Sequence, residues 1–255
     1  MRLFLLLLML PIVHIAAAQH LHVKPYARYH QSVSSQNEPV FAVIPLTIRS
    51  GGTLDVFVTS LDKNFTLSSG IQYGLAVGYT FGKNLGIEIG ANYFNTNKSF
   101  GDRDKIDWHY QSVNITPSFT FAFEHKKSMF IGKAGVLIGI ARMDLYYPLR
   151  VGFGISGDFD TKINWGYTAG IEYDYLLSRH FSVTVEIGLE HYKYTPKKAT
   201  FISHNDVAQV YKEFEIEYMK EETTEDIASP KQKRLEESVL FNSIYFGIGI
   251  KYKLF

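Results

Sequence analysis

The chain has 255 residues, no cysteine and a formal net charge of +1. The absence of cysteine excludes a disulfide scaffold, a thiolate metal site and a lipid anchor attached to a cysteine. The near-neutral charge gives no indication of a nucleic-acid partner, which a concentrated basic face would provide. Aromatic residues at 15% beside 20 glycines favour a single all-β domain over two ordinary domains.

The N-terminus has the organisation of a secretory signal peptide. Met1 and Arg2 precede an apolar run over 3–15, and the alanines at 16–18 form a small-residue cleavage site. The run is shorter than the roughly 20 residues that a membrane-spanning helix needs, so we expect it to be removed. We therefore predict a signal peptide over 1–18 and one mature β-barrel domain over 19–255.

The first alternating segment follows this site directly. Within 21–29 the odd positions would face one way, and Lys24, Tyr26 and Arg28 the other. Pro25 weakens the pattern, because proline has no N–H to donate to a neighbouring strand.

The clearest β-hairpin covers 70–93. From Gly70 to Phe81 the odd positions are bulky and the even positions are small or polar, which is a strict period of two. A tight turn at 82–84 leads into 85–93, which has the same alternation.

Five further segments repeat this alternation, with short turns joining some of them. Leu137 is the one large apolar side chain on a face that is otherwise small or polar. The five segments are 113–123, 128–140, 163–175, 181–189 and 244–254.

The segments together predict an all-β, closed, antiparallel up-and-down barrel of eight strands. An alternative of ten strands is open, because 40–48 and 53–60 could form another hairpin. Pro45 and Asp55 interrupt that pattern, so eight is the favoured number. Short turns near 82, 126 and 178 alternate with long connections at 36–68, 98–107, 146–162 and 195–237, as in membrane barrels. We expect the last connection to be a mobile, solvated loop.

The two faces of the strands indicate a membrane barrel. One face is bulky and aromatic, and side chains of that size from eight strands would overfill a small barrel's interior. They fit better against lipid. The other face mixes small residues with charges, which suits a narrow lumen in which acids and bases pair. The predicted lumen charge network is Lys24, Arg28, Glu88, Lys133, Glu172, Asp174, Glu186, Glu190, Lys251 and Lys253.

The C-terminal run from Gly249 to Phe255 resembles the assembly signal of outer-membrane barrels, through Gly249, Tyr252, Leu254 and the final Phe255. Phe255 departs from the pattern, because it lies one residue beyond the phase of Tyr252 and Leu254. With the hairpin at 78–86, the chain resembles the outer-membrane β-barrel domain family of the small OmpA/OmpX type of Gram-negative bacteria. The resemblance implies an outer-membrane location, with membrane lipid and the barrel-assembly machinery as partners.

The favoured function is that of a small barrel that anchors surface loops for envelope integrity or contact with a surface ligand, without chemistry and without a cofactor. A narrow porin-like channel for small or apolar solutes is the alternative, and would depend on lumen groups around Glu186 and Lys251. A lipid-modifying enzyme is the third hypothesis, with candidates at His109, Ser112, Glu190 and His191. Histidines at 20, 22 and 30 could bind a metal, but there is no thiolate and no clear third ligand, and no metal site is predicted.

Overall fold

The computed structural model describes residues 18–33, 68–81, 84–100, 106–150, 153–161, 163–205, 210–219, 231–235 and 239–254. None of these residues forms a helix long and apolar enough to cross a membrane. The strands are β1 (Ala18–Ser32), β2 (Gly70–Phe81), β3 (Leu85–Phe100), β4 (Ile106–His125), β5 (Ser128–Arg150), β6 (Phe153–Thr161), β7 (Asn164–Leu176), β8 (Phe181–Tyr194), β9 (Pro196–Asn205), β10 (Val210–Met219), β11 (Lys231–Leu235) and β12 (Val239–Lys253).

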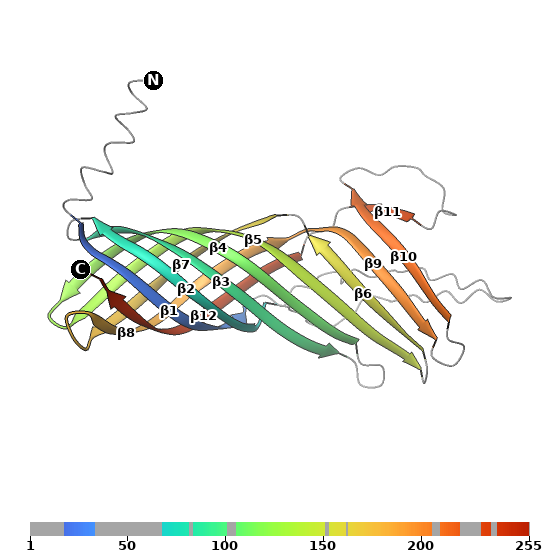
Figure 1. Cartoon of the computed structure of the whole chain (residues 1–255), viewed down its shortest axis with the longest axis horizontal. Helices are drawn as coiled ribbons and strands as arrows, with labels where there is room; N and C mark the ends of the chain where they lie inside the picture. The colour runs from blue at the N-terminus through green and yellow to red at the C-terminus, as the bar shows by residue number, and fades with distance from the viewer. Residues whose placement is uncertain are drawn as a thin grey trace, which may run out of the picture.

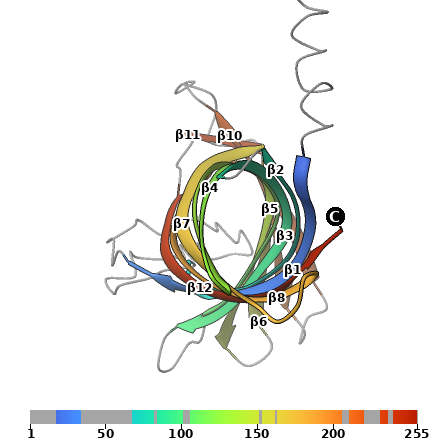
Figure 2. The same ribbon diagram turned by 90° about the vertical axis from the view of Figure 1, so that its left-hand side faces the viewer.

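Eight of these strands close into an antiparallel barrel (Figures 1 and 2). Around the wall the order is β1, β2, β3, β4, β5, β7, β8 and β12, and the pairing of β12 with β1 closes the ring. Closure satisfies the backbone groups that an open edge would expose to lipid. The predicted eight-stranded barrel is therefore confirmed.

The weak first segment is strand β1, and it is paired on both sides. Tyr26 lies opposite Gly74 of β2 and Gly249 of β12. Because β1 pairs directly with β2, the ten-strand alternative is wrong for this barrel. The proposed hairpin over 40–60 itself lies outside the described residues.

The two ends of the barrel differ. Strand β1 begins and β12 finishes at the end where short turns connect β2 to β3, β4 to β5 and β7 to β8. We call this the turn end. At the other end β5 continues past Gly139, its last residue paired with β7, and pairs with β6 from Arg142 to Arg150.

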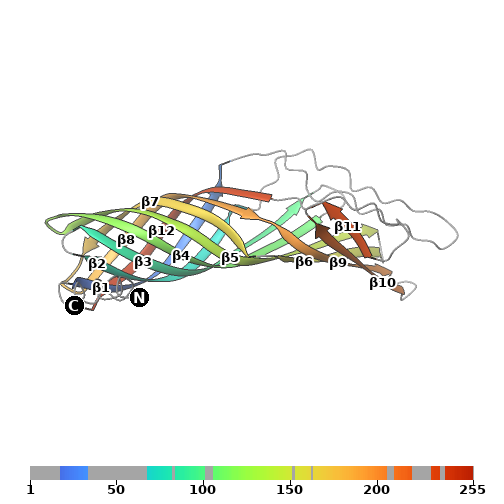
Figure 3. The same cartoon turned by 90° about the horizontal axis from the view of Figure 1, so that it is seen from above.

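This continuation forms a sheet that projects beyond the barrel (Figures 1 and 3). Beyond the barrel β6 takes the place of β7 beside β5. Strand β9 pairs with β6 from Phe153–Asn205 to Thr161–Pro196, and so takes the place of β8. Strand β10 pairs with β9, and β11 pairs with β10 in parallel. We call β6, β9, β10, β11 and the adjoining ends of β3, β4 and β5 the extension sheet.

The extension sheet corrects three expectations about connections. The predicted loop at 146–162 contains the end of β5 and the whole of β6, and the predicted loop at 195–237 contains β9, β10 and β11. The connection at 98–107 is shorter than expected, because β3 runs to Phe100 and β4 starts at Ile106.

The physical reason is that the outward residues change from apolar to polar along the strands, while the same alternate positions stay inward. Within the barrel the outward side chains are large and apolar, as for Phe119 and Ile248, which are 78% and 66% exposed. In the extension sheet the outward side chains are polar, as for Arg142 and Asp158, and the inward Phe159 is fully buried. A search for apolar outward residues therefore misses these strands.

Candidate functional site

The period of two directs the predicted lumen charges inward. In strand β8 every second residue from Ser182 to Tyr194 is buried. The buried carboxylates are Glu88 on β3, Glu172 and Asp174 on β7, and Glu186 and Glu190 on β8. The cations of the same interior are Lys24 and Arg28 on β1, Lys133 on β5 and Lys251 on β12.

Glu172 is the centre of this network and is fully buried. Nζ of Lys24 donates to its Oε2 at 2.6 Å, and Lys133 and Lys251 form ion pairs with the same carboxylate. Lys251 also contacts Oδ2 of Asp174 at 2.5 Å. One acid thus joins strands β1, β5 and β12 across the lumen.

Glu88 extends the network toward the turn end. Nζ of Lys133 donates to its Oε1 at 2.7 Å, and Nζ of Lys24 lies 3.5 Å from the same oxygen. Nε2 of His22 lies 3.3 Å from Oε2. The sequence had not marked His22 as part of this group.

Arg28 and Glu186 form a second layer nearer the extension sheet, which Lys24 links to the Glu172 group through its Nζ at 3.5 Å from Oε2 of Glu186. Nε of Arg28 donates to Oε1 of Glu186 at 2.6 Å, and its second terminal nitrogen donates to Oε2 at 3.1 Å. The guanidinium carbon lies 4.4 Å from the ring centres of both Tyr26 and Tyr245, so two aromatic faces support the buried cation. The bidentate geometry is the strong form of an acid–base pair.

Two residues of the predicted lumen charge network, Glu190 and Lys253, lie apart from these contacts. The carboxylate of Glu190 is 3.8 Å from Nε2 of His30, at the other side of the Arg28 layer. Lys253 is partly exposed and lines a cavity of about 390 Å³ with His22 and Glu88. The lumen is thus hollow near the turn end and filled by ion pairs above it.

A chain of amides continues the Arg28 layer across the wall. Nη1 of Arg28 donates to Gln72, and the Gln72 amide donates to Oδ1 of Asn92 at 3.0 Å. Asn114 donates to the same oxygen at 3.0 Å, so that three amides are linked in sequence. These amide residues were not among the predicted site residues, although each lies on the inward phase of its strand.

Aromatic side chains close the interior beyond these polar layers. The rings of Tyr110 and Phe241 stack at 4.6 Å, and those of Trp108 and Phe159 at 6.1 Å. Tyr194 is fully buried with its ring 5.7 Å from that of Tyr110. We call these five residues the aromatic cap. The sequence feature that could have predicted the aromatic cap is the presence of apolar side chains at the inward positions 108, 110 and 159.

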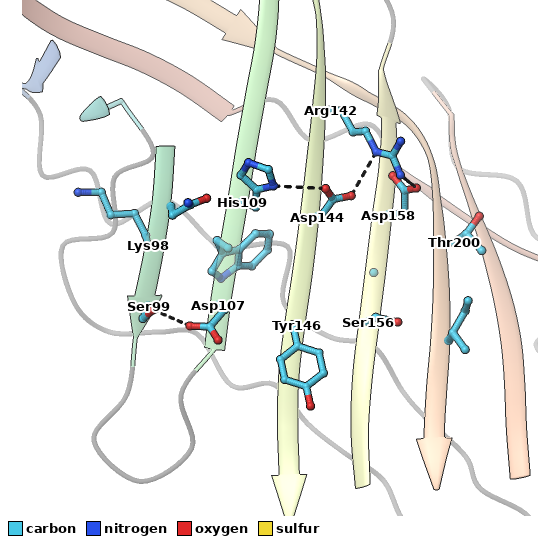
Figure 4. Close-up of a pocket in the computed structure, with 14 residues that line it drawn as sticks. Lys98, Ser99, Asp107, His109, Arg142, Asp144, Tyr146, Ser156, Asp158 and Thr200 are labelled. Atoms are coloured by element: carbon cyan, nitrogen blue, oxygen red, sulfur yellow. Dashed lines mark hydrogen bonds and ion pairs between the residues drawn. The ribbon is translucent and has the colours of Figure 1, made fainter. Parts of the chain in front are cut away.

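A large polar pocket lies on the outward face of the extension sheet (Figure 4). Arg142 forms ion pairs with Asp144, at 3.3 Å, and with Asp158, and Nδ1 of His109 lies 3.7 Å from Asp144. Partial burial raises the pKa of Asp158 above its ordinary value, although Arg142 favours the charged form. We call this pocket, of about 760 Å³, the outer-face pocket; its lining also includes Asn97, Lys98, Ser99, Asp107, Trp108, Tyr146, Ser156, Gly157, Thr200 and Ile202.

The candidate catalytic residues are divided between the interior of the barrel and its outward face. Ser112 and Glu190 line the interior. His109 contacts Asn95 and Asp144 in the outward phase, and His191 stacks on Tyr167 at 4.6 Å. The four residues therefore do not form one cluster.

The candidate metal-binding histidines are also separated by their contacts. His22 lies against Glu88, and Nδ1 of His30 is 2.9 Å from Oγ of Ser243. The side chain of His20 lies outside the described part. In the described ranges there is no group of three or more His, Asp or Glu that could hold a metal ion.

Of the C-terminal motif residues, Gly249 and Tyr252 lie in the closing strand β12, Leu254 directly follows it, and Phe255 lies outside the described residues. Tyr252 and Leu254 are about equally exposed on the outward face, at 39% and 40%. Gly249 lies between Tyr26 and Thr184, and a Cβ there would be 2.8 Å from the carbonyl oxygen of Pro25. The glycine therefore permits close approach of β1 and β12.

The apolar outer wall, closed strand ring and charged interior define a transmembrane β-barrel of the outer-membrane class. The chain belongs to the outer membrane protein beta-barrel domain family, whose family model matches residues 3–208. This confirms the resemblance seen in the sequence and gives the protein an outer-membrane location.

One solved structure supports this fold, and two others resemble the chain without adding support. The chain is similar to a major outer membrane protein from Thermus thermophilus, with 12% identity and a TM-score of 0.50 over 92% of this chain and 100% of that chain. For OprG from Pseudomonas aeruginosa the identity is 15% and the TM-score 0.49, over 93% of this chain and 96% of that one. For CarO from Acinetobacter baumannii the values are 12% and 0.34, over 71% and 91%. A search of curated protein sequences found no match.

Proposed function

We propose that the protein is a non-conducting outer-membrane barrel that displays the extension sheet and its outer-face pocket on the cell surface. Its role is envelope integrity or contact with a surface ligand, and no catalytic step is assigned to it. The observation that carries this proposal is the filled lumen, in which Lys24 and Glu172 are fully buried and in direct contact. A layer filled in this way supports a lumen that is closed to water and ions.

The orientation follows from the general architecture of outer-membrane barrels, which have short periplasmic turns and longer extracellular connections. The turn end then faces the periplasm, and the extension sheet faces the medium. A signal peptide over 1–18 exports the chain, and the barrel-assembly machinery recognises the C-terminal strand with Gly249, Tyr252, Leu254 and Phe255.

The first experiment is single-channel recording on the refolded mature barrel in a planar bilayer. Heat-modifiable migration on a gel first establishes that the barrel is folded. A folded barrel without current supports the proposal. Steady ionic current would overturn it in favour of the channel alternative, in which the lumen charges line water.

A second experiment tests whether the extension sheet is exposed on the cell surface. An epitope inserted between Arg150 and Phe153, at the far end of the extension sheet, should be detected on intact cells. The matched insertion between His125 and Ser128, at the turn end, should be detected only after the outer membrane is permeabilised. The reverse pattern would contradict the orientation.

A further inference from the structure

A small chamber lies inside the barrel between the Arg28 layer and the aromatic cap. Its cavity is about 30 Å³. The side chains that define it are His30, Asn114, Glu190, Tyr110, Tyr192 and Phe241. It is separate from the outer-face pocket, which lies on the opposite face of the sheet.

The chamber contains a buried carboxylate without a fixed cation. Each of the other four lumen carboxylates lies within 2.7 Å of a Lys or Arg nitrogen, through Lys133, Lys24, Lys251 and Arg28. Five buried acids against these four cations leave one acid over. That acid is Glu190, whose ion-pair contact among the described residues is His30 at 3.8 Å. A buried charge needs a partner of opposite sign or a proton.

Further polar atoms of the chamber walls form no hydrogen bond of normal geometry, although the hydroxyl groups of Tyr110 and Tyr192 interact with each other. They are Nε2 of His30, Oδ1 of Asn114 and the hydroxyl oxygens of Tyr110 and Tyr192. All four side chains are more than nine-tenths buried. Unpaired buried polar atoms are rare in proteins, and here they gather around one cavity. Their convergence indicates a ligand with several hydrogen-bond donors.

The remaining wall is aromatic. Phe241 stacks on Tyr110 at 4.6 Å and lies 6.2 Å from the ring of Tyr192. The ring of Phe94 stands edge-on to His30 at 5.3 Å. Aromatic rings around a carboxylate attract an ammonium group through their negative faces. A hard divalent metal ion would instead favour several charged ligands, and the described residues contain no group of three or more His, Asp or Glu that could hold one.

We propose that this chamber binds a small ammonium-type cation. The Glu190 carboxylate compensates its charge, while Oδ1 of Asn114 and the hydroxyls of Tyr110 and Tyr192 accept its N–H groups. A cavity of about 30 Å³ admits ammonium or methylammonium and excludes larger quaternary amines, because one water-sized probe already requires about 10–15 Å³. The site is distinct from display at the surface and does not depend on the proposed function.

The test uses the refolded full-length mature barrel in lipid vesicles at neutral pH. Its unfolding temperature is measured by heat-modifiable gel migration in chloride salts of ammonium, methylammonium, sodium and tetramethylammonium at equal ionic strength. Ammonium and methylammonium should raise the midpoint in a concentration-dependent way, as a ligand of the folded state does. Sodium and tetramethylammonium should not.

Glu190→Gln should abolish the ammonium effect, whereas the matched Glu124→Gln at an exposed turn-end carboxylate should retain it. Tyr192→Phe provides a second variant should Glu190→Gln fail to fold, and we expect it to weaken ammonium binding about tenfold, since it removes one hydrogen bond to a charged group. Equal effects of sodium and ammonium, or an undiminished ammonium effect in both chamber variants, would overturn the proposal and leave water as the chamber's occupant.

Discussion

Nζ of Lys24 lies 2.6 Å from Oε2 of Glu172, which joins β1 to a strand three positions away around the barrel wall. Both side chains are fully buried. The contact crosses the lumen, so it links parts of the wall that share no backbone hydrogen bond. Because Lys133 and Lys251 meet the same carboxylate, removing the acid and removing one base have unequal consequences.

Glu172→Gln should destabilise the barrel by about 3–5 kcal/mol, because it leaves buried lysines without their shared anion. Lys24→Met should cost less, since Glu172 keeps two lysine partners. Urea titration in lipid vesicles, followed by tryptophan fluorescence, measures both. Arg142→Leu is the control, because its ion pairs are exposed and contribute about 0–1 kcal/mol. A cost for Lys24→Met equal to that of Glu172→Gln would contradict the central role of the acid.

Glycines make room for the large inward side chains, and Gly74 gives a direct test. A Cβ at this position would lie 2.3 Å from Cζ of Tyr26, so Gly74→Ala should destabilise by about 1–3 kcal/mol through overpacking. In Tyr26→Leu the same substitution should cost less, and a double-mutant cycle in urea measures the difference. Gly132→Ala is the matched control, because its Cβ would meet its nearest atom at 3.9 Å. Independent costs for Gly74→Ala and Tyr26→Leu would show that the ring does not occupy this space.

Alternation is a local property, and for that reason the sequence predicts which strand face each residue joins. Lys24 and Arg28 were assigned to the lumen although Pro25 interrupts their segment, and both are buried. Leu137, the apparent exception, keeps the inward phase and is 1% exposed. The strand period therefore held even where residue type disagreed with it.

The alternation could not predict which side chains pair with each other across the lumen. These pairings depend on how far the sheet is staggered when it closes, and no single strand encodes that quantity. Glu172 thus receives lysines from three strands, and Glu190 meets His30 instead of a lysine. The extension sheet was missed for another reason, since water outside the membrane favours polar outward residues such as Arg142.

The ion-pair layers and the aromatic cap lie one after another along the lumen, so each should block current independently. Tyr110→Ala with Phe241→Ala removes the stacked pair of the cap but should leave the barrel silent in a planar bilayer. Adding Lys24→Ala with Glu172→Ala and Arg28→Ala with Glu186→Ala, which removes pairs from both ion-pair layers, should produce current steps. Tyr167→Ala with His191→Ala, which removes a stacked pair on the outer face, is the control in both backgrounds and should change nothing. Current from the cap variant alone would show that the ion-pair layers do not seal the lumen.

The change from apolar to polar outward residues along β8 should mark the boundary of the membrane. Ile187 lies within a run of exposed apolar residues, from Phe181 to Leu189, whereas His191 follows at the end of that run. Ile187→Arg should therefore destabilise the barrel by about 2–4 kcal/mol, and His191→Arg by about 0–1 kcal/mol, because the cost of a lipid-facing charge falls toward the interface. Urea titration in vesicles compares the two. Similar costs at both positions would mean that the hydrocarbon region extends past His191, and that the outer-face pocket lies closer to lipid than its polar lining indicates.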